Sequence, residues 1–181
     1  MTPKAIDIMY MLNTNYDPER DKLQLSPHPY MEESARLFAE IKAGRWAAEL
    51  AEIKEHLRDE HARHLEREAK INAIEGLDEL RAAIADVSRY RREFAAMMDD
   101  EFNDGVFPPV LPPHDINALK AKYPRAAAYL AAECWSESAN DSKAKYGAYA
   151  IDRLIDGDDP ADVIGEMSKS WSNYCLRNVW D

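Results

Sequence analysis

Glycine and cysteine are scarce in this sequence, and long apolar runs are missing altogether. Only six glycines occur among 181 residues, whereas Ala, Leu, Glu, Lys and Arg dominate, a mixture that favours helices and can still bury a core. No apolar stretch approaches the ~20 residues that a membrane-spanning helix needs. The two cysteines, Cys134 and Cys175, lie far apart without CxxC spacing, so we expect free thiols and no disulfide.

Several sequence signals of export and catalysis are also missing. The first residues contain no basic segment leading into a long apolar run, so we expect no signal peptide and a soluble, cytoplasmic protein. The chain has no Gly-rich phosphate loop, no GxSxG motif, no recognisable Cys–His dyad and no paired-cysteine zinc site. We therefore predict no catalytic residues and no cofactor.

A surplus of basic residues is absent as well. The net charge of −11 argues against a protein that grips nucleic acid over a broad face, because phosphate contacts need a Lys and Arg surplus. The acid excess lies mainly in residues 31–114, which hold 19 acidic and 12 basic residues. The middle of the chain is therefore where a basic partner is most strongly attracted.

Residues 1–30 form an N-terminal segment with one short helix. The apolar stretch 5–12 predicts this helix, and the turn-rich stretch after it contains Pro18, Pro27 and Pro29, which break any long element.

Residues 31–103 read as a long helical region with an apolar seam. In the second half Leu77, Leu80, Ile84, Val87, Arg91, Phe94 and Met98 alternate at intervals of three and four, which is typical of a coiled coil. Gly76 suits a left-handed helix cap, and Asp78 suits the start of the next helix. We predict two antiparallel helices, 31–75 and 78–103; the first, on the order of 65 Å long, either projects or bends at Gly44. One continuous helix through Gly76 is the alternative, because a single Gly costs only ~1 kcal/mol.

The remaining chain consists of a connector and a helical bundle. Residues 104–114 contain four prolines and make a stiff, extended connector. In residues 115–181 we expect four helices, with Asp115 and Asp159 as caps, Pro124 opening a helix, and the last helix reaching Asn178. The predicted fold is all-α: a long helical hairpin joined to a small C-terminal bundle.

The stretch EHLRDEHARHLERE, residues 55–68, holds three of the five histidines and is the first candidate for chemistry. Metalloprotease helices carry HExxH, but His61 and His64 are three apart and the Glu precedes both. The inverted motif HxxEH also fails by one residue, starting from His56. A pair such as His61 and His64 would need further ligands, so we predict no metal site; a metal-dependent enzyme using His56–His64 is the weakest alternative.

The acidic run MDDEFND, residues 98–104, is the second candidate. Counted from Asp99, an EF-hand calcium loop requires Gly at position 6 and Glu at position 12, where this chain has Asp104 and Val110. The run instead offers a carboxylate patch to a basic partner. We predict partner-binding roles for Asp99, Asp100, Glu101 and Asp104, and for Trp180, which can anchor a partner near the C-terminus.

The C-terminal third, AAAYLAAECWSESANDSKAKYGAYAIDRLIDGDDPADVIGEMSKSWSNYC, resembles small helical proteins carried by prophages and mobile elements of gut-type bacteria. The similarity lies in the order AYL…A…W…S…SK…G…A…L..G.D…VI.EM…WS.Y. Small, acidic, helical proteins of mobile elements are often similar to inhibitors of host defence, including anti-CRISPR proteins. The resemblance implies a setting, and no functional residue is carried over from it.

Two main functional hypotheses follow from these observations. The first is a non-enzymatic interaction protein whose acidic hairpin competes for a basic, nucleic-acid-binding surface, with an anti-CRISPR inhibitor of a Cas effector as its concrete form. The second is a scaffold or phage accessory protein that self-associates, for example as a homodimer, through the coiled-coil seam.

Overall fold

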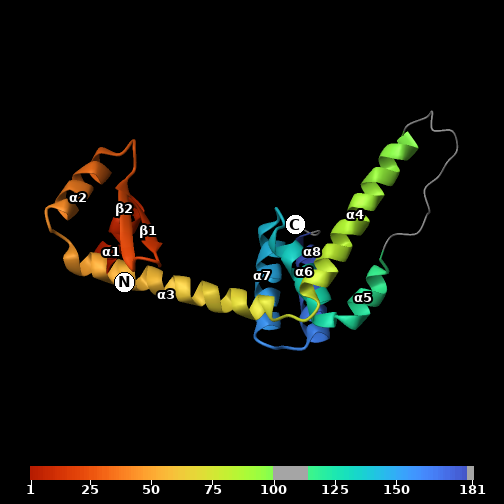
Figure 1. Ribbon diagram of the computed structural model, residues 1–181. Coiled ribbons are helices and arrows are strands. Elements are labelled where there is room, and N and C mark those ends of the chain that lie inside the picture. The colour runs from red at the N-terminus through yellow and green to blue at the C-terminus, as the bar shows by residue number, and fades with distance from the viewer. Residues whose placement is uncertain (100–113, 179–181) are drawn as a thin grey trace. The chain divides into compact units, whose positions relative to one another are not determined.

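A computed structural model describes residues 1–99 and 114–178, without the side chains of residues 94–99, 171 and 173–178. The described chain is mostly helical, and it also contains one small antiparallel sheet (Figure 1). In chain order the elements are α1 (Pro3–Met11), β1 (Leu12–Asp17), β2 (Lys22–Pro27), α2 (Glu32–Lys42), α3 (Ala47–Asn72), α4 (Leu77–Asp99), α5 (Ile116–Lys122), α6 (Pro124–Ser136), α7 (Asp141–Ile155) and α8 (Pro160–Asn178). None of the helices in the described ranges is long and apolar enough to cross a membrane.

The chain divides into two compact units, Met1–Glu68 and Ala69–Asp181. Because α3 runs from Ala47 to Asn72, it passes through the boundary between them. Each unit has its own hydrophobic core, and the two are described separately below.

The N-terminal unit packs α1, a two-stranded hairpin and α2 against the first half of α3. Thr2 is the N-cap of α1, and its hydroxyl accepts a hydrogen bond from the amide of Ala5 at 3.2 Å. The strands pair in register from Leu12 opposite Pro27 to Asp17 opposite Lys22. The buried core combines residues from four elements, namely Ala5, Ile8, Leu12, Leu37 and Ile53.

The β-hairpin formed by β1 and β2 corrects the prediction of an all-α chain. Residues 14–30 were expected to be turn-rich, yet β2 and most of β1 form there. Leu23 and Leu25 alternate with exposed residues along β2 and pack on the core, which is the period of two that a strand requires. Pro27 ends β2, a position where the missing amide is tolerated.

The predicted bend at Gly44 is a full break between α2 and α3. Gly44 and Trp46 both have positive φ angles, +86° and +67°, which no helix continues through. The indole N–H of Trp46 donates to the Glu40 carboxylate at 3.1 Å and holds the turn.

The break predicted near Gly76 is also present, with different boundaries. Helix α3 ends at Asn72, and Gly76 has φ +73° in the turn that follows. Helix α4 begins at Leu77, and the amide of Leu80 donates to the carbonyl of Gly76 at 2.9 Å. Asp78 therefore lies inside the first turn of α4, where a negative charge is favourable, and does not occupy the cap position.

The apolar seam expected to join the two long helices is divided between two cores. Ile53 of α3 is buried in the N-terminal unit, with Leu50 and Leu57 packed nearby. Leu77 and Leu80 of α4 are buried in the C-terminal unit. The predicted antiparallel hairpin over residues 31–103 is therefore not confirmed.

The C-terminal unit is built on α6, α7 and α8, which lie side by side in Figure 1. Its caps agree with the sequence prediction: the Asp115 carboxylate accepts from two amides of α5, and Asp159 accepts from two amides of α8. Pro124 is the first residue of α6. The buried core includes Leu80, Tyr129, Ala132, Leu154 and Val163.

Candidate functional site

The residues predicted to bind a partner fall outside the part of the chain whose side chains the structure describes. Asp99 is the last residue of α4, but its side chain is not described. Asp100, Glu101, Asp104 and Trp180 lie outside the described residues. Their predicted role stays a prediction.

The three histidines of α3 point to different neighbours. His56 lies 3.4 Å from Glu60, and His64 lies 3.3 Å from Glu68, each one helical turn away. The ring of His61 packs against Tyr16 of β1, with ring centroids 6.1 Å apart. Among the described residues, no three His, Cys, Asp or Glu side chains gather in a way that could hold a metal ion.

Tyr16, the neighbour of His61, belongs to a network of hydrogen-bonded side chains that was not predicted from the sequence. The Tyr16 hydroxyl donates to the Asp21 carboxylate at 2.8 Å, and Asp21 accepts from Lys54 of α3 at 2.7 Å. The hydrogen bond to Asp21 is the main reason why the pKa of Tyr16 is raised, and the bond from Lys54 is the main reason why the pKa of Asp21 is lowered. A tyrosine with a raised pKa is a poor general base. The hydrogen-bonded network therefore connects the turn between β1 and β2 to α3 and does not activate a proton acceptor.

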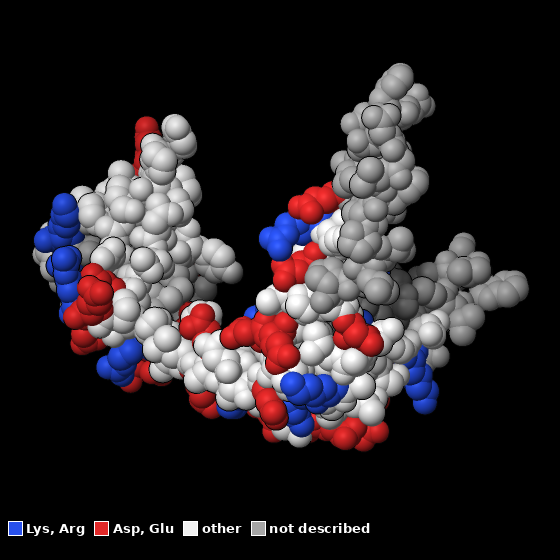
Figure 2. Space-filling model, turned by 45° about the vertical axis from the view of Figure 1, so that its right-hand side comes forward, with Lys and Arg blue, Asp and Glu red and all other residues white. Residues whose placement is uncertain are grey.

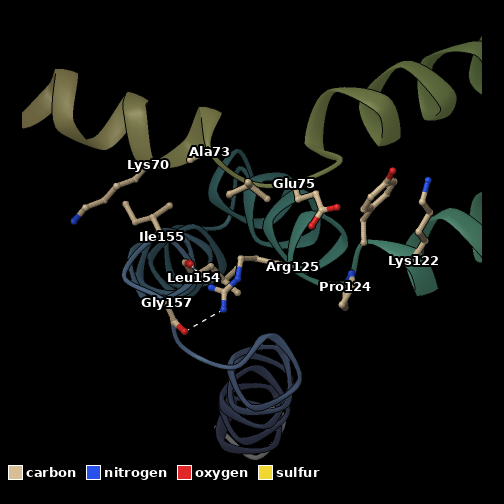
Figure 3. Close-up of a pocket in the computed structure, with 11 residues that line it drawn as sticks. Lys70, Ala73, Glu75, Lys122, Pro124, Arg125, Leu154, Ile155 and Gly157 are labelled. Carbon is tan, nitrogen blue, oxygen red and sulfur yellow. Dashed lines mark hydrogen bonds between the residues drawn. The ribbon is translucent and has the colours of Figure 1, made fainter.

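A pocket of about 440 Å³ in the C-terminal unit gathers three cationic side chains (Figure 3). Arg125, near the start of α6, lies at its centre. The guanidinium donates to the carbonyl of Leu154 at 2.5 Å and to that of Gly157 at 3.0 Å. These are carbonyls at the end of α7, which the helix itself leaves without donors. Arg125 therefore acts as a cap of α7.

The two lysines of this pocket are also engaged by neighbouring groups. Lys70 pairs with Asp156 at 3.0 Å. Lys122 lies 4.5 Å from the ring centroid of Tyr123 and 3.9 Å from Glu79. A hydrogen bond with Tyr123 is the main cause, and the Glu79 charge a lesser one, of the raised pKa of Lys122. The polar contacts in this pocket thus support the structure around the end of α7.

Helix α3 is exposed along most of its length. Only Ile53 of its 26 residues is buried. Five of its carboxylate residues are exposed, namely Glu55, Asp59, Glu60, Glu66 and Glu68. A helix that is polar nearly all round either bridges two domains or is stabilised by many ion pairs along its surface, and α3 both crosses the unit boundary and carries such pairs.

The charges are mixed on α3, which has seven acidic and five basic residues, and also elsewhere. On the face drawn in Figure 2, acidic side chains lie among Lys and Arg side chains and do not form one continuous field. Arg153 is typical: it pairs with Asp158 at 2.6 Å and also with Glu166, and these two hydrogen bonds raise its pKa. Local pairs such as these reduce the attraction that the acid excess exerts on a distant partner.

No family model, no curated protein and no solved structure matches this chain.

Proposed function

We propose that this chain is a non-enzymatic interaction protein whose acidic middle segment binds a basic, nucleic-acid-binding surface of a partner. An anti-CRISPR inhibitor of a Cas effector is the concrete form of the proposal. The observation that carries it is α3: 26 residues with a single buried side chain and five exposed carboxylates, in the part of the chain with the largest acid excess.

The physical basis of such binding is competition for cationic side chains. Surfaces that hold nucleic acid carry Lys and Arg that neutralise phosphates. Carboxylates spaced along an exposed helix offer the same sign of charge and raise the rate of encounter with such a surface. One exposed ion pair contributes only ~0–1 kcal/mol, so several carboxylates must act together. Asp99, Asp100, Glu101 and Asp104 are proposed as further contact groups for the same partner.

Self-association through the apolar seam is the alternative function. Several seam residues already pack inside this chain and are not available to a second copy. Leu50, Ile53 and Leu57 of α3 already belong to the N-terminal core, and Leu77 and Leu80 to the C-terminal core. Light scattering separates the two proposals, because the scaffold requires a dimer or larger species at micromolar concentration.

The test of the interaction proposal uses two charge variants. One carries Asp99→Asn, Asp100→Asn, Glu101→Gln and Asp104→Asn; the other neutralises the five exposed carboxylates of α3. A matched control neutralises four exposed acids elsewhere, namely Asp7, Glu32, Glu33 and Glu137. Partners are captured from a bacterial lysate with and without nuclease, and inhibition of target cleavage by purified RNA-guided Cas nucleases is measured in parallel.

We expect both charge variants to bind the captured partner at least ~10-fold more weakly, whereas the control binds as the unchanged protein does. Binding should also fall steeply between about 50 and about 200 mM salt. Equal binding by all variants, or equal loss in the control, contradicts the proposal.

A further inference from the structure

A groove runs along one face of α4 in the C-terminal unit. Two hollows make it up, one of about 580 Å³ against α5 and one of about 430 Å³ against α6. Ile84 and Lys120 line both hollows, so the two lie next to each other. The α4 side chains that line the groove, from Leu80 to Arg91, recur at helical intervals of three and four, as a single helix face requires.

The floor of the groove is apolar, and small residues line its edges. Leu80 and Val87 are buried, and Ile84 and Leu130 are half-buried around them. Ala85 and Ala131 are exposed at the edge of the hollow against α6, together with Cys134. Small residues beside an apolar floor leave room for the side chains of a second helix.

The charged residues around the groove differ in whether they have an ion-pair partner. Of its two acidic residues among those described, Glu133 pairs with Arg81 at 2.6 Å, whereas Asp115 caps α5 and has no ion-pair partner. His114 is 3.2 Å from Asp86. Lys120 and Arg91 are both exposed, and neither has an ion-pair partner among the described residues. Among the described residues, two basic residues and one acidic residue of this groove therefore have no ion-pair partner, in a protein whose net charge is −11.

We propose that this groove is a docking site for an amphipathic helical segment of another protein, with apolar residues on one face and carboxylates beside them. The apolar face would cover Ile84 and Leu130, which are only half-buried, and the carboxylates would pair with Lys120 and Arg91. From Leu80 to Arg91 the groove follows α4 for ~16 Å, which matches about three turns of a docked helix. The partner here is acidic, so this site goes beyond the proposed function and is independent of it.

The test uses two synthetic peptides of about 14 residues, long enough for the groove as helices. Both carry Leu at helical intervals of three and four. One has Glu at the flanking positions and the other has Lys. Because this protein is strongly acidic, its overall field favours the Lys peptide. A preference for the Glu peptide can then come only from a local positive site.

Binding is measured by the anisotropy of labelled peptides and by the rate of maleimide alkylation of Cys134 in a Cys175→Ser background. We expect the Glu peptide to bind at least ~10-fold more tightly than the Lys peptide and to slow alkylation of Cys134. Lys120→Glu with Arg91→Glu should reverse the preference between the peptides. Such a reversal distinguishes charge recognition from loss of folding, which would abolish binding of both.

A pair of exposed alanines on α4 supplies a matched steric control. Ala85 lines the groove and Ala82 does not. Ala85→Gln should weaken the Glu peptide several-fold, whereas Ala82→Gln should leave its binding unchanged. Equal binding of both peptides, or no response to the charge reversal, overturns the proposal. Protection of Cys134 that rises with protein concentration in the absence of peptide would place a second copy in the groove and would also overturn it.

Discussion

The backbone of Gly147 in α7 packs directly against the backbone of Ser136 at the end of α6. A Cβ atom at position 147 would lie 2.3 Å from the amide nitrogen of Ser136 and 2.6 Å from the carbonyl oxygen of Ala132. Because both neighbours are backbone atoms, they cannot move aside as the end of a flexible side chain can. The contact brings α6 and α7 together at the centre of the C-terminal unit.

Gly147→Ala should therefore destabilise the C-terminal unit, although alanine favours helix. Overpacking in a core typically costs ~1–3 kcal/mol, and the helix preference of alanine returns ~1 kcal/mol of this. We expect a lower midpoint of urea unfolding, followed by circular dichroism. Gly165→Ala in α8 is the control, because a Cβ there meets no atom within 4 Å, and it should stabilise by ~0.5–1 kcal/mol. Equal effects of the two substitutions would mean that α6 and α7 are not in backbone contact.

Arg125 should contribute to stability as the cap of α7. Arg125→Met removes both hydrogen bonds to the carbonyls of Leu154 and Gly157, and we expect a loss of ~1–3 kcal/mol in the free energy of unfolding. Arg125→Lys keeps the charge without the planar fork, so its loss should be intermediate. Lys145→Met replaces an exposed lysine on α7 and should change the stability by less than ~0.5 kcal/mol. If all three variants unfold alike, Arg125 is not a cap.

Features encoded by neighbouring residues could be predicted from the sequence. Asp115 and Asp159 cap their helices, and Pro124 opens α6, because each of these signals acts within one helical turn. The break at Gly76 was predicted because only glycine adopts a positive φ without strain, whereas a bend at Gly44 was raised by the length of the first helix.

Features that depend on distant partners could not be predicted. The spacing of the seam residues identified the apolar face of each helix, but it could not predict which element packs against that face. Ile53 and Leu80 belong to separate cores. The hairpin was missed because its alternating apolar residues, Leu23 and Leu25, are too few to stand out between prolines. Arg125 has no local signal at all, because its acceptors lie about thirty residues away.

The histidines of α3 should differ in structural importance and should not form a zinc site. His61 is half-buried against Tyr16, whereas the His64 side chain is 63 % exposed. We expect His61→Ala to destabilise the N-terminal unit by ~0.5–1 kcal/mol, and His64→Ala by less than ~0.5 kcal/mol. Zinc added to untagged protein should leave the melting temperature unchanged, because only binding to the folded state raises it. A zinc-dependent rise that His64→Ala abolishes would instead support the metal-dependent alternative.

The hydrogen bonds of Asp21 with Lys54 and Tyr16 should make the stability of the N-terminal unit depend on pH at both extremes. The pKa of Asp21 is lowered from its ordinary value of 3.8, so its contribution to stability is present above that pH and is lost as the pH falls below it. The pKa of Tyr16 is raised from 10.0, so its contribution is present below pH 10 and is lost as the pH rises through the higher value.

Asp21→Asn tests this bond with little disturbance of the turn. Position 21 has φ +46°, a conformation that asparagine tolerates about as well as aspartate does. The variant removes the charge and the strong acceptor, so the pKa of Tyr16 should return toward 10.0, as measured by NMR titration of its ring carbon. Asp7→Asn, a charge-matched change at an exposed position of α1, should leave that pKa where it is. An unaltered Tyr16 titration in Asp21→Asn would show that the raised pKa has another cause.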